Sequence, residues 1–167
     1  MKQLLTLFSC VLILSVVGCG GSKKPPGMPP LHATTLTFTQ GGTPLAGATV
    51  TLSPQDDANA QWSFGGATDN NGVLNAQTQG FDGLPEGSFK IAVTKTETEG
   101  TPAAVESSDL GGGSPAASGG VKSFYLVDKK YRSTGTTDLI LEVKPGKNAQ
   151  TFDLGSAVRE EIPVYKN

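Results

Sequence analysis

The sequence predicts an all-β fold, an antiparallel sandwich of seven or eight strands that follows a cleaved signal and a flexible linker. From residue 31 onward, apolar residues alternate with polar ones at period two. Clusters of Gly, Pro, Asn and Asp separate the alternating segments, as turns separate strands. No segment beyond the linker has the apolar periodicity of a helix. The core is therefore expected to come from the inward faces of strands.

The first 18 residues have the composition of an export signal. Lys2 gives a positive start, and residues 4–17 form an apolar stretch interrupted by three hydroxyl residues. The stretch is 14 residues long. A membrane-spanning helix needs about 17–25 apolar residues. We therefore expect residues 1–18 to be a signal peptide that is cut away.

The apolar stretch ends in Val16-Val17-Gly18-Cys19, which resembles the bacterial lipobox. The resemblance implies that Cys19 is acylated on sulfur, that the chain is cut just before it, and that the new amino end is acylated too. Each buried methylene contributes about 0.8 kcal/mol, and two acyl chains give a stable anchor. The alternative is a plain secretory signal followed by an incidental cysteine.

The expected location is a membrane reached through this lipid anchor. Gly20 follows the cysteine where Asp would retain a lipoprotein in the inner membrane, so the resemblance implies the outer membrane, facing the periplasm or the cell surface. Cys10 lies in the signal and Cys19 would carry lipid, which leaves the mature chain without a thiol for a disulfide. Removing Lys2 changes 13 basic and 15 acidic residues to 12 and 15, a formal charge of −3. This charge excludes nucleic acid as an expected partner, because nucleic-acid binding needs a clustered basic surface.

Residues 19–33 are expected to form the lipidated cysteine and a Pro/Gly-rich linker. Residues 20–30 contain four prolines and three glycines without apolar periodicity, which is typical of an extended spacer. Such a spacer reaches roughly 30 Å at about 3.1 Å per residue. Lys23 and Lys24 could contact anionic headgroups or simply be solvated.

Residues 34–155 are expected to form one sandwich. The glycines and proline of residues 41–44 turn the first alternating segment into the second, so we expect these two strands to form a hairpin. A tight turn is expected at residues 69–72. The strands expected in the first part of the chain are 35–39, 48–53, 62–64, 73–78 and 88–94.

Residues 96–120 contain few large apolar side chains and many glycines, so we expect a flexible loop there. Strands are expected again at 121–127, 137–144 and 151–154, with 156–167 as a C-terminal tail. The part after the loop is too small to bury a core of its own, which favours one domain over two domains separated by the loop. The residues expected inside are Val50, Phe89, Ile91, Val93, Leu139 and Leu141.

Three motifs occur in order: GTPLAGATVTL at 42–52, ATDNNG at 67–72 and LPEGSFKIAV at 84–93. Together they resemble the carboxypeptidase regulatory-like family, with Phe89 where tyrosine is commoner. The resemblance implies a transthyretin-like (prealbumin-like) sandwich and a binding or structural module without an active site. Residues 127–133 with 136–139 also resemble small bacterial lipoproteins that carry this domain.

The sequence offers no catalytic set, so we expect no enzyme, no cofactor and no metal. The single histidine, His32, has no predictable Ser or Asp partner, and no His and Cys cluster could hold zinc. Neighbouring carboxylates, as at Glu160 and Glu161, should point apart and be solvated.

Three weaker candidates have plain structural alternatives. Loop oxygens could bind calcium, but their spacing departs from the established loop motif. Trp62 could stack on a sugar or belong to the core. A cluster around Tyr131 could form a binding rim or be solvated charge at a strand end. The residues concerned are Asp56, Asp57 and Asn59, or Asp69, Asn70 and Asn71, for calcium, and Lys129, Lys130 and Arg132 around Tyr131.

The expected function is that of a membrane-anchored, cell-envelope lipoprotein with a non-catalytic β-sandwich binding or structural module. The alternative is an accessory subunit of a membrane transport or secretion complex. The expected partner besides the membrane is a protein or a polysaccharide of the envelope.

Overall fold

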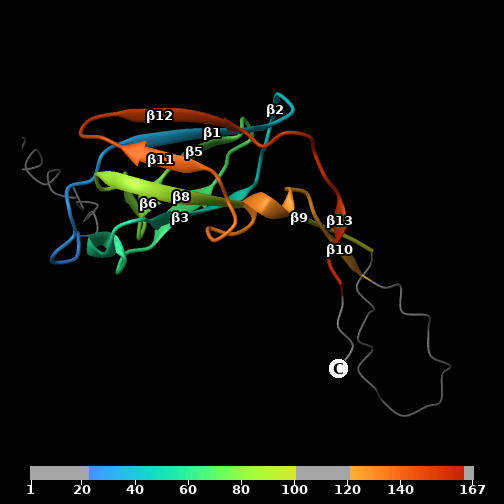
Figure 1. Cartoon of the computed structure of the whole chain (residues 1–167), viewed down its shortest axis with the longest axis horizontal. Helices are drawn as coiled ribbons and strands as arrows, with labels where there is room; N and C mark the ends of the chain where they lie inside the picture. The colour runs from blue at the N-terminus through green and yellow to red at the C-terminus, as the bar shows by residue number, and fades with distance from the viewer. Residues whose placement is uncertain (1–22, 101–120, 164–167) are drawn as a thin grey trace, which may run out of the picture.

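The computed structural model describes residues 23–100 and 121–163, and these residues form an all-β structure of three sheets (Figure 1). The only helical segments in this part of the chain are two short 3₁₀ turns, η1 (Asp57–Asn59) and η2 (Lys129–Tyr131). The expected signal peptide, Cys19 and residues 101–120 of the expected loop lie outside the described residues. The predicted all-β class is confirmed.

The largest sheet has six strands in the order β11-β8-β3-β4-β6-β7, and all neighbours are antiparallel. At its centre, Thr49 to Pro54 pair with Phe89 to Thr94. The predicted strand at 88–94 is confirmed almost to the residue. The bounds are β3 Thr49–Pro54, β4 Phe64–Ala67, β6 Gln77–Thr78, β7 Phe81–Asp82, β8 Gly87–Thr94 and β11 Ile140–Val143.

The second sheet has four strands and contains a parallel pair. Its order is β12-β1-β2, with β5 also paired to β1. β1 and β12 run parallel from Thr34 with Asn148 to Thr39 with Asp153, so this one pair departs from the antiparallel arrangement that the sequence predicts and the other described pairs follow. A short hairpin connection forces two strands to pair antiparallel. β1 and β12 are far apart in the sequence, so no such connection fixes their direction. The bounds are β1 Thr34–Gln40, β2 Thr43–Pro44, β5 Val73–Asn75 and β12 Asn148–Asp153.

The expected hairpin between the first two alternating segments is wrong. β1 turns at Gly41 and Gly42 into the short β2, which pairs back onto β1. The chain then crosses to the other sheet, where β3 pairs with β4 and β8. Two alternating segments joined by a Gly/Pro turn have the same pattern whether they share a sheet or face each other across a core.

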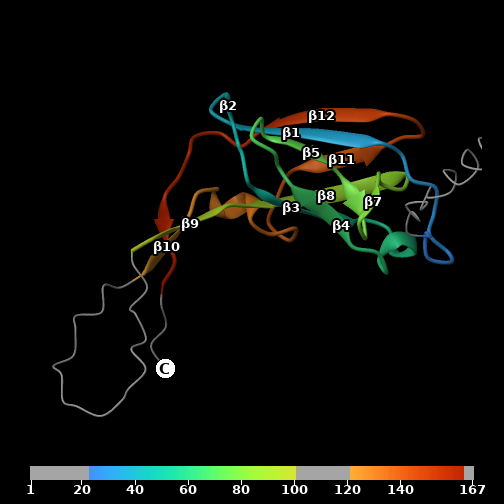
Figure 2. The ribbon, with the colours of Figure 1, turned by 180° about the vertical axis from the view of Figure 1, so that it is seen from behind.

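The core lies between the four-stranded and six-stranded sheets, which Figures 1 and 2 show stacked face to face. Phe38 stacks on Phe152 with ring centroids 5.6 Å apart, and Phe64 meets Phe89 edge-on at 5.2 Å. Five of the expected core residues are buried and the sixth, Leu139, is partly buried against the core. The confirmed buried set is Val50, Phe89, Ile91, Val93 and Leu141.

Local turn chemistry agrees with the sequence. Asp69 Oδ1 accepts hydrogen bonds from the N–H groups of Asn71 and Val73, each at 2.8 Å. Gly72 ends this turn at φ +72°, and a Cβ there would lie 2.4 Å from the Phe38 carbonyl oxygen. Gly47 has φ +66° before β3, a conformation that glycine adopts without strain. The buried Thr68 hydroxyl donates to the Leu45 carbonyl at 2.6 Å and accepts from the backbone N–H of the residue that precedes β3.

A third sheet, which we call the arm, projects from one end of the sandwich (Figures 1 and 2). It consists of β9 (Thr96–Glu99), β10 (Lys122–Tyr125) and β13 (Glu160–Glu161), in the order β13-β10-β9. The described part of the linker lies at the opposite end of the sandwich.

The arm corrects three sequence predictions. Residues 96–99 of the expected loop are a strand, and residues 160–161 of the expected tail are another. The strand expected at 121–127 is the shorter β10 of the arm, while Val127 is buried in the sandwich core. The all-exposed β9 has no apolar face that would mark it as a strand. Its pairing with β10, from Lys122 with Glu99 to Tyr125 with Thr96, is what orders it.

Candidate functional site

The predicted site residues are spread over the sandwich, and the structure gives most of them structural roles. His32 lies at the end of the linker, where its backbone pairs with Leu84 at 2.7 and 3.0 Å. Its Nδ1 accepts a hydrogen bond from the Gly146 N–H at 3.2 Å. These contacts join the linker to the sandwich, so His32 helps to fix the entry of the chain.

The carboxylates considered for calcium are used in turns. Asp56 Oδ1 accepts from the backbone and side-chain nitrogens of Asn59, at 3.1 and 3.3 Å, and so caps η1. Asp69 caps its own turn, as described above. Within residues 23–100 and 121–163, no group of three or more His, Cys, Asp or Glu is placed to hold a metal ion.

The two aromatic candidates behave differently from an exposed binding platform. Tyr131 is 7% exposed and belongs to the core, so the interpretation of an exposed rim centred on this ring is wrong. The ring lies in η2, a tight turn that directs it inward. Trp62 is partly buried and packs against the core. The strand expected at 62–64 begins later, because β4 begins at Phe64.

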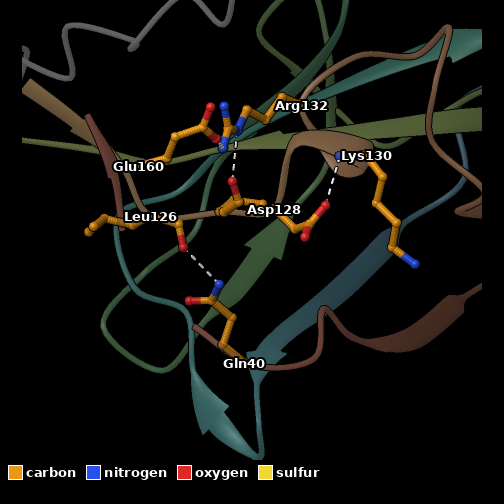
Figure 3. Close-up of polar contacts among 7 residues, drawn as sticks. Gln40, Leu126, Asp128, Lys130, Arg132 and Glu160 are labelled. Carbon is orange, nitrogen blue, oxygen red and sulfur yellow. Dashed lines mark hydrogen bonds and ion pairs between the residues drawn. The ribbon is translucent and has the colours of Figure 1, made fainter. Parts of the chain in front are cut away.

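Arg132 holds the base of the arm together (Figure 3). Its Nε donates to the Val127 carbonyl at 2.7 Å, and a terminal nitrogen pairs with the Glu160 carboxylate. The guanidinium carbon lies 4.1 Å from the centroid of the Tyr125 ring. The Arg132 side chain is only 13% exposed. One side chain therefore links η2, β10 and β13.

Two further contacts join the arm to the sandwich. Gln40, at the end of β1, donates from Nε2 to the Leu126 carbonyl at 2.8 Å (Figure 3). The Leu126 N–H donates to the Lys95 carbonyl at 2.9 Å. Asp128 Oδ1 accepts from the Lys130 N–H at 2.9 Å and caps η2. The arm is thus fixed at its base by hydrogen bonds.

A second arginine covers the other face of the arm. Phe124 and Tyr125 are consecutive in β10 and therefore point to opposite faces. Arg159 lies over the Phe124 ring, 3.6 Å from its centroid, and pairs with Glu99. Each face thus has one aromatic ring beneath one arginine that also binds a glutamate. Contacts between cations and rings, with ion pairs, take the place of a hydrophobic core in the arm.

Lys130 lies over the Tyr131 ring and forms an ion pair with Asp138. Its Nζ lies 3.5 Å from Asp138 Oδ2 and 4.4 Å from the centroid of the Tyr131 ring. The pKa of Lys130 is raised above its ordinary value, chiefly by a side-chain hydrogen bond with Tyr131, with partial desolvation opposing and the Asp138 charge supporting the shift. Lys130 is therefore protonated at neutral pH.

Asp153 ties the end of β12 to the turn between β1 and β2. Its carboxylate accepts from the N–H groups of Gly155 at 2.7 Å, Gly42 at 3.0 Å and Gly41 at 3.3 Å, and from the Thr39 hydroxyl at 2.9 Å. The hydrogen bonds, first among them the one from Gly155, lower the pKa of Asp153 below its ordinary value.

An open hollow of about 460 Å³ lies on the outer face of the six-stranded sheet. It forms where Gly65 and Gly66 leave β4 without side chains, between Thr51 on β3 and Gln77 on β6. Its lining residues, all of them in the described part of the chain, are uncharged. Hydroxyl and amide groups are its polar components.

The contacts that define the arm could not be foreseen from the sequence. Arg132 and Glu160 are 28 residues apart, and Gln40 and Leu126 are 86 apart. The only signal in the sequence was the basic cluster at residues 129–132. It indicates the segment that contains Arg132, but it suggested Tyr131 as the centre of a site. Comparisons with protein-family models, curated proteins and solved structures give no match. No helix among the residues described is long and apolar enough to cross a membrane.

Proposed function

We propose that the chain is a membrane-anchored lipoprotein of the cell envelope whose β-sandwich is a non-catalytic binding or structural module. In this proposal Cys19 carries the lipid, and the lipid anchors the chain in the outer membrane. The observation that best supports it is the position of the linker and the arm at opposite ends of the sandwich (Figure 2). A chain tethered just before residue 23 would direct the arm away from the membrane.

The finer type of the sandwich is also part of the proposal. We propose a prealbumin-like module of the carboxypeptidase regulatory-like kind. In support, Gly47 makes the crossing turn before β3 and Asp69 closes the turn before β5. The third motif contains most of β8, the most buried strand of the large sheet. Each motif therefore corresponds to a folding device.

A second candidate, an accessory subunit of a membrane transport or secretion complex, is favoured by the arm. The arm projects beyond the sandwich (Figure 1) and exposes two ion pairs, Lys122 with Glu161 and Arg159 with Glu99, on the face that carries Phe124. Such a ribbon suits contact with a protein, because charged groups on a projecting surface fix the register of a partner. The uncharged hollow would suit a polysaccharide better.

The anchor is tested with Cys19→Ser. The parent protein is expected in the detergent phase and in membrane fractions, and the variant in the aqueous phase. A variant that still partitions like the parent contradicts lipidation. On a density gradient, the parent is expected with outer-membrane markers, and sedimentation with inner-membrane markers would contradict that location.

The partner is tested by photo-crosslinking in whole cells. A crosslinking amino acid at Thr98, which is exposed in β9, is expected to capture a protein. The same group at Ala58, which is exposed in η1, is the matched control. Equal yields from both positions would contradict a contact at the arm. Retention of the protein on envelope polysaccharide, with no protein captured from Thr98, would assign the module to glycan binding instead.

A further inference from the structure

β12 has fewer of the features that prevent pairing with another strand than the other described strands at sheet edges. Edge strands are usually protected by shortness, charge or proline. β2, β7 and β13 have two residues each and β5 has three. β9 carries Glu97 and Glu99, and β11 carries Glu142. β12 has six residues and no charge before its last one, Asp153.

The backbone of β12 has a free side. The Leu154 N–H donates to a carbonyl of β1, and the Asn148 N–H donates to the carbonyl of the residue before β1, both at 2.8 Å. The even-numbered residues of β12 therefore direct their backbone groups toward β1. Along a strand these directions alternate, so Ala149, Thr151 and Asp153 direct theirs outward. β12 pairs only with β1 among the strands of residues 23–100 and 121–163. Ala149, Gln150 and Thr151 are all exposed.

We propose that β12 is the surface through which two copies of this chain associate, edge to edge and antiparallel, with Thr151 facing Thr151 of the second copy. Thr151 is the outward-directed residue nearest the middle of the strand. A two-fold axis there places Ala149 opposite Asp153 of the second copy. The two four-stranded sheets join into one continuous sheet through backbone hydrogen bonds.

Charge favours the antiparallel direction and a second copy as the occupant. Lys147 precedes β12 and Asp153 ends it, and their spacing places them on the same face. Antiparallel pairing brings Lys147 of each copy diagonally near Asp153 of the other. Parallel pairing would place like charges together, which is unfavourable between neighbouring strands. The edge is thus complementary to itself in one direction only.

The pairing is tested by disulfide trapping in the full-length chain purified in detergent. Cys10→Ser and Cys19→Ser in every variant leave the introduced cysteine as the only thiol. Thr151→Cys is expected to form a disulfide-linked dimer on mild oxidation. Residues facing each other across an antiparallel pair have Cα atoms about 5.5 Å apart, within the range that a disulfide bridges. The control Thr98→Cys is exposed in an edge strand that carries two glutamates, and it is expected to give about fivefold less dimer.

The register is tested by a charge change on the Thr151→Cys background. Lys147→Glu is expected to lower the dimer yield by about threefold or more, because it places like charges near each other. Lys144→Glu, at another exposed lysine before the strand, is expected to leave the yield unchanged. Melting temperatures confirm that each variant is folded. A Thr151→Cys yield no higher than that of Thr98→Cys, or equal effects of the two charge changes, would overturn the proposal.

Discussion

The sandwich and the arm are both built from β-strands, but different forces hold them. In the sandwich, aliphatic and aromatic side chains such as Phe38, Phe89 and Ile91 are completely buried. In the arm, Arg132 and Arg159 cover one aromatic ring each and bind glutamates. The hydrophobic effect grows with buried area, whereas exposed ion pairs contribute little and are screened by salt. The arm should therefore open locally while the sandwich stays folded.

The largest expected effect is on the sandwich. Ile91→Ala removes a fully buried side chain and should lower the free energy of unfolding by about 2–5 kcal/mol. Denaturant titration followed by circular dichroism measures this loss. Thr51→Ala, on the exposed face of the neighbouring β3, is the matched control and should change stability little. A mild loss at Ile91 would contradict a single core between the two sheets.

The next effect concerns the base of the arm. Arg132→Ala removes a charge-assisted hydrogen bond, an ion pair and a ring contact. A hydrogen bond to a charged group contributes about 1.5–3 kcal/mol, so the arm should open much more often. Hydrogen exchange is expected to accelerate at residues 122–125 and to stay slow at residues 89–93. Arg132→Lys keeps the charge but loses the planar contacts, and it should give an intermediate result. Equal acceleration in both segments would mean that the arm and the sandwich unfold together.

A smaller effect is expected from acid. The folded protein lowers the pKa of Asp153, so this carboxylate stabilises the fold above its unfolded pKa, and the contribution is lost as pH falls through the folded pKa. Asp153→Asn should lower the melting temperature at neutral pH, and the difference from the parent should shrink below about pH 4. Asp57→Asn, at an exposed carboxylate in η1, is the control. A difference that is constant across this pH range would show that the charge has no role.

The smallest expected effect is that of salt on the arm. Lys122 with Glu161 and Arg159 with Glu99 are exposed pairs, worth about 0.2–1 kcal/mol each. At 1 M salt the Debye length is about 3 Å, so these pairs should weaken. Hydrogen exchange in β10 is expected to quicken modestly with salt, while exchange in β8 stays unchanged. An arm that becomes more protected in salt would indicate an apolar contribution missing from this description.

Periodicity allowed the sandwich strands to be predicted because their burial alternates. β8 and β3 present apolar side chains at every second position, and the turn at Asp69 has its own chemical signature. The assignment of strands to sheets could not be predicted in the same way. β1 and β3 have similar patterns, yet they lie in different sheets, because the pattern records burial and not the neighbour.

The arm escaped prediction for a different physical reason. β9 reads Thr-Glu-Thr-Glu and has no buried face, so its strand character depends on the partner β10, across residues 101–120. The interpretation of Tyr131 as the centre of an exposed rim was wrong for a similar reason. Its neighbours Lys130 and Arg132 suggested exposure, but η2 turns the ring into the core and leaves the arginine over Tyr125. Lipidation at Cys19 stays a prediction.

The parallel pairing of β1 with β12 has a consequence for the order of events during folding. The Thr39 hydroxyl binds Asp153 across 114 residues of sequence, so the second sheet can be completed only when almost the whole chain is present. When the chain emerges N-terminus first, β1 has only β2 and β5 as neighbours in its sheet until β12 is available. Contacts this distant in sequence slow folding. A chain that closes so late can stay unfolded while it is threaded through a narrow channel, and it gains its stable form only after the last strand has emerged.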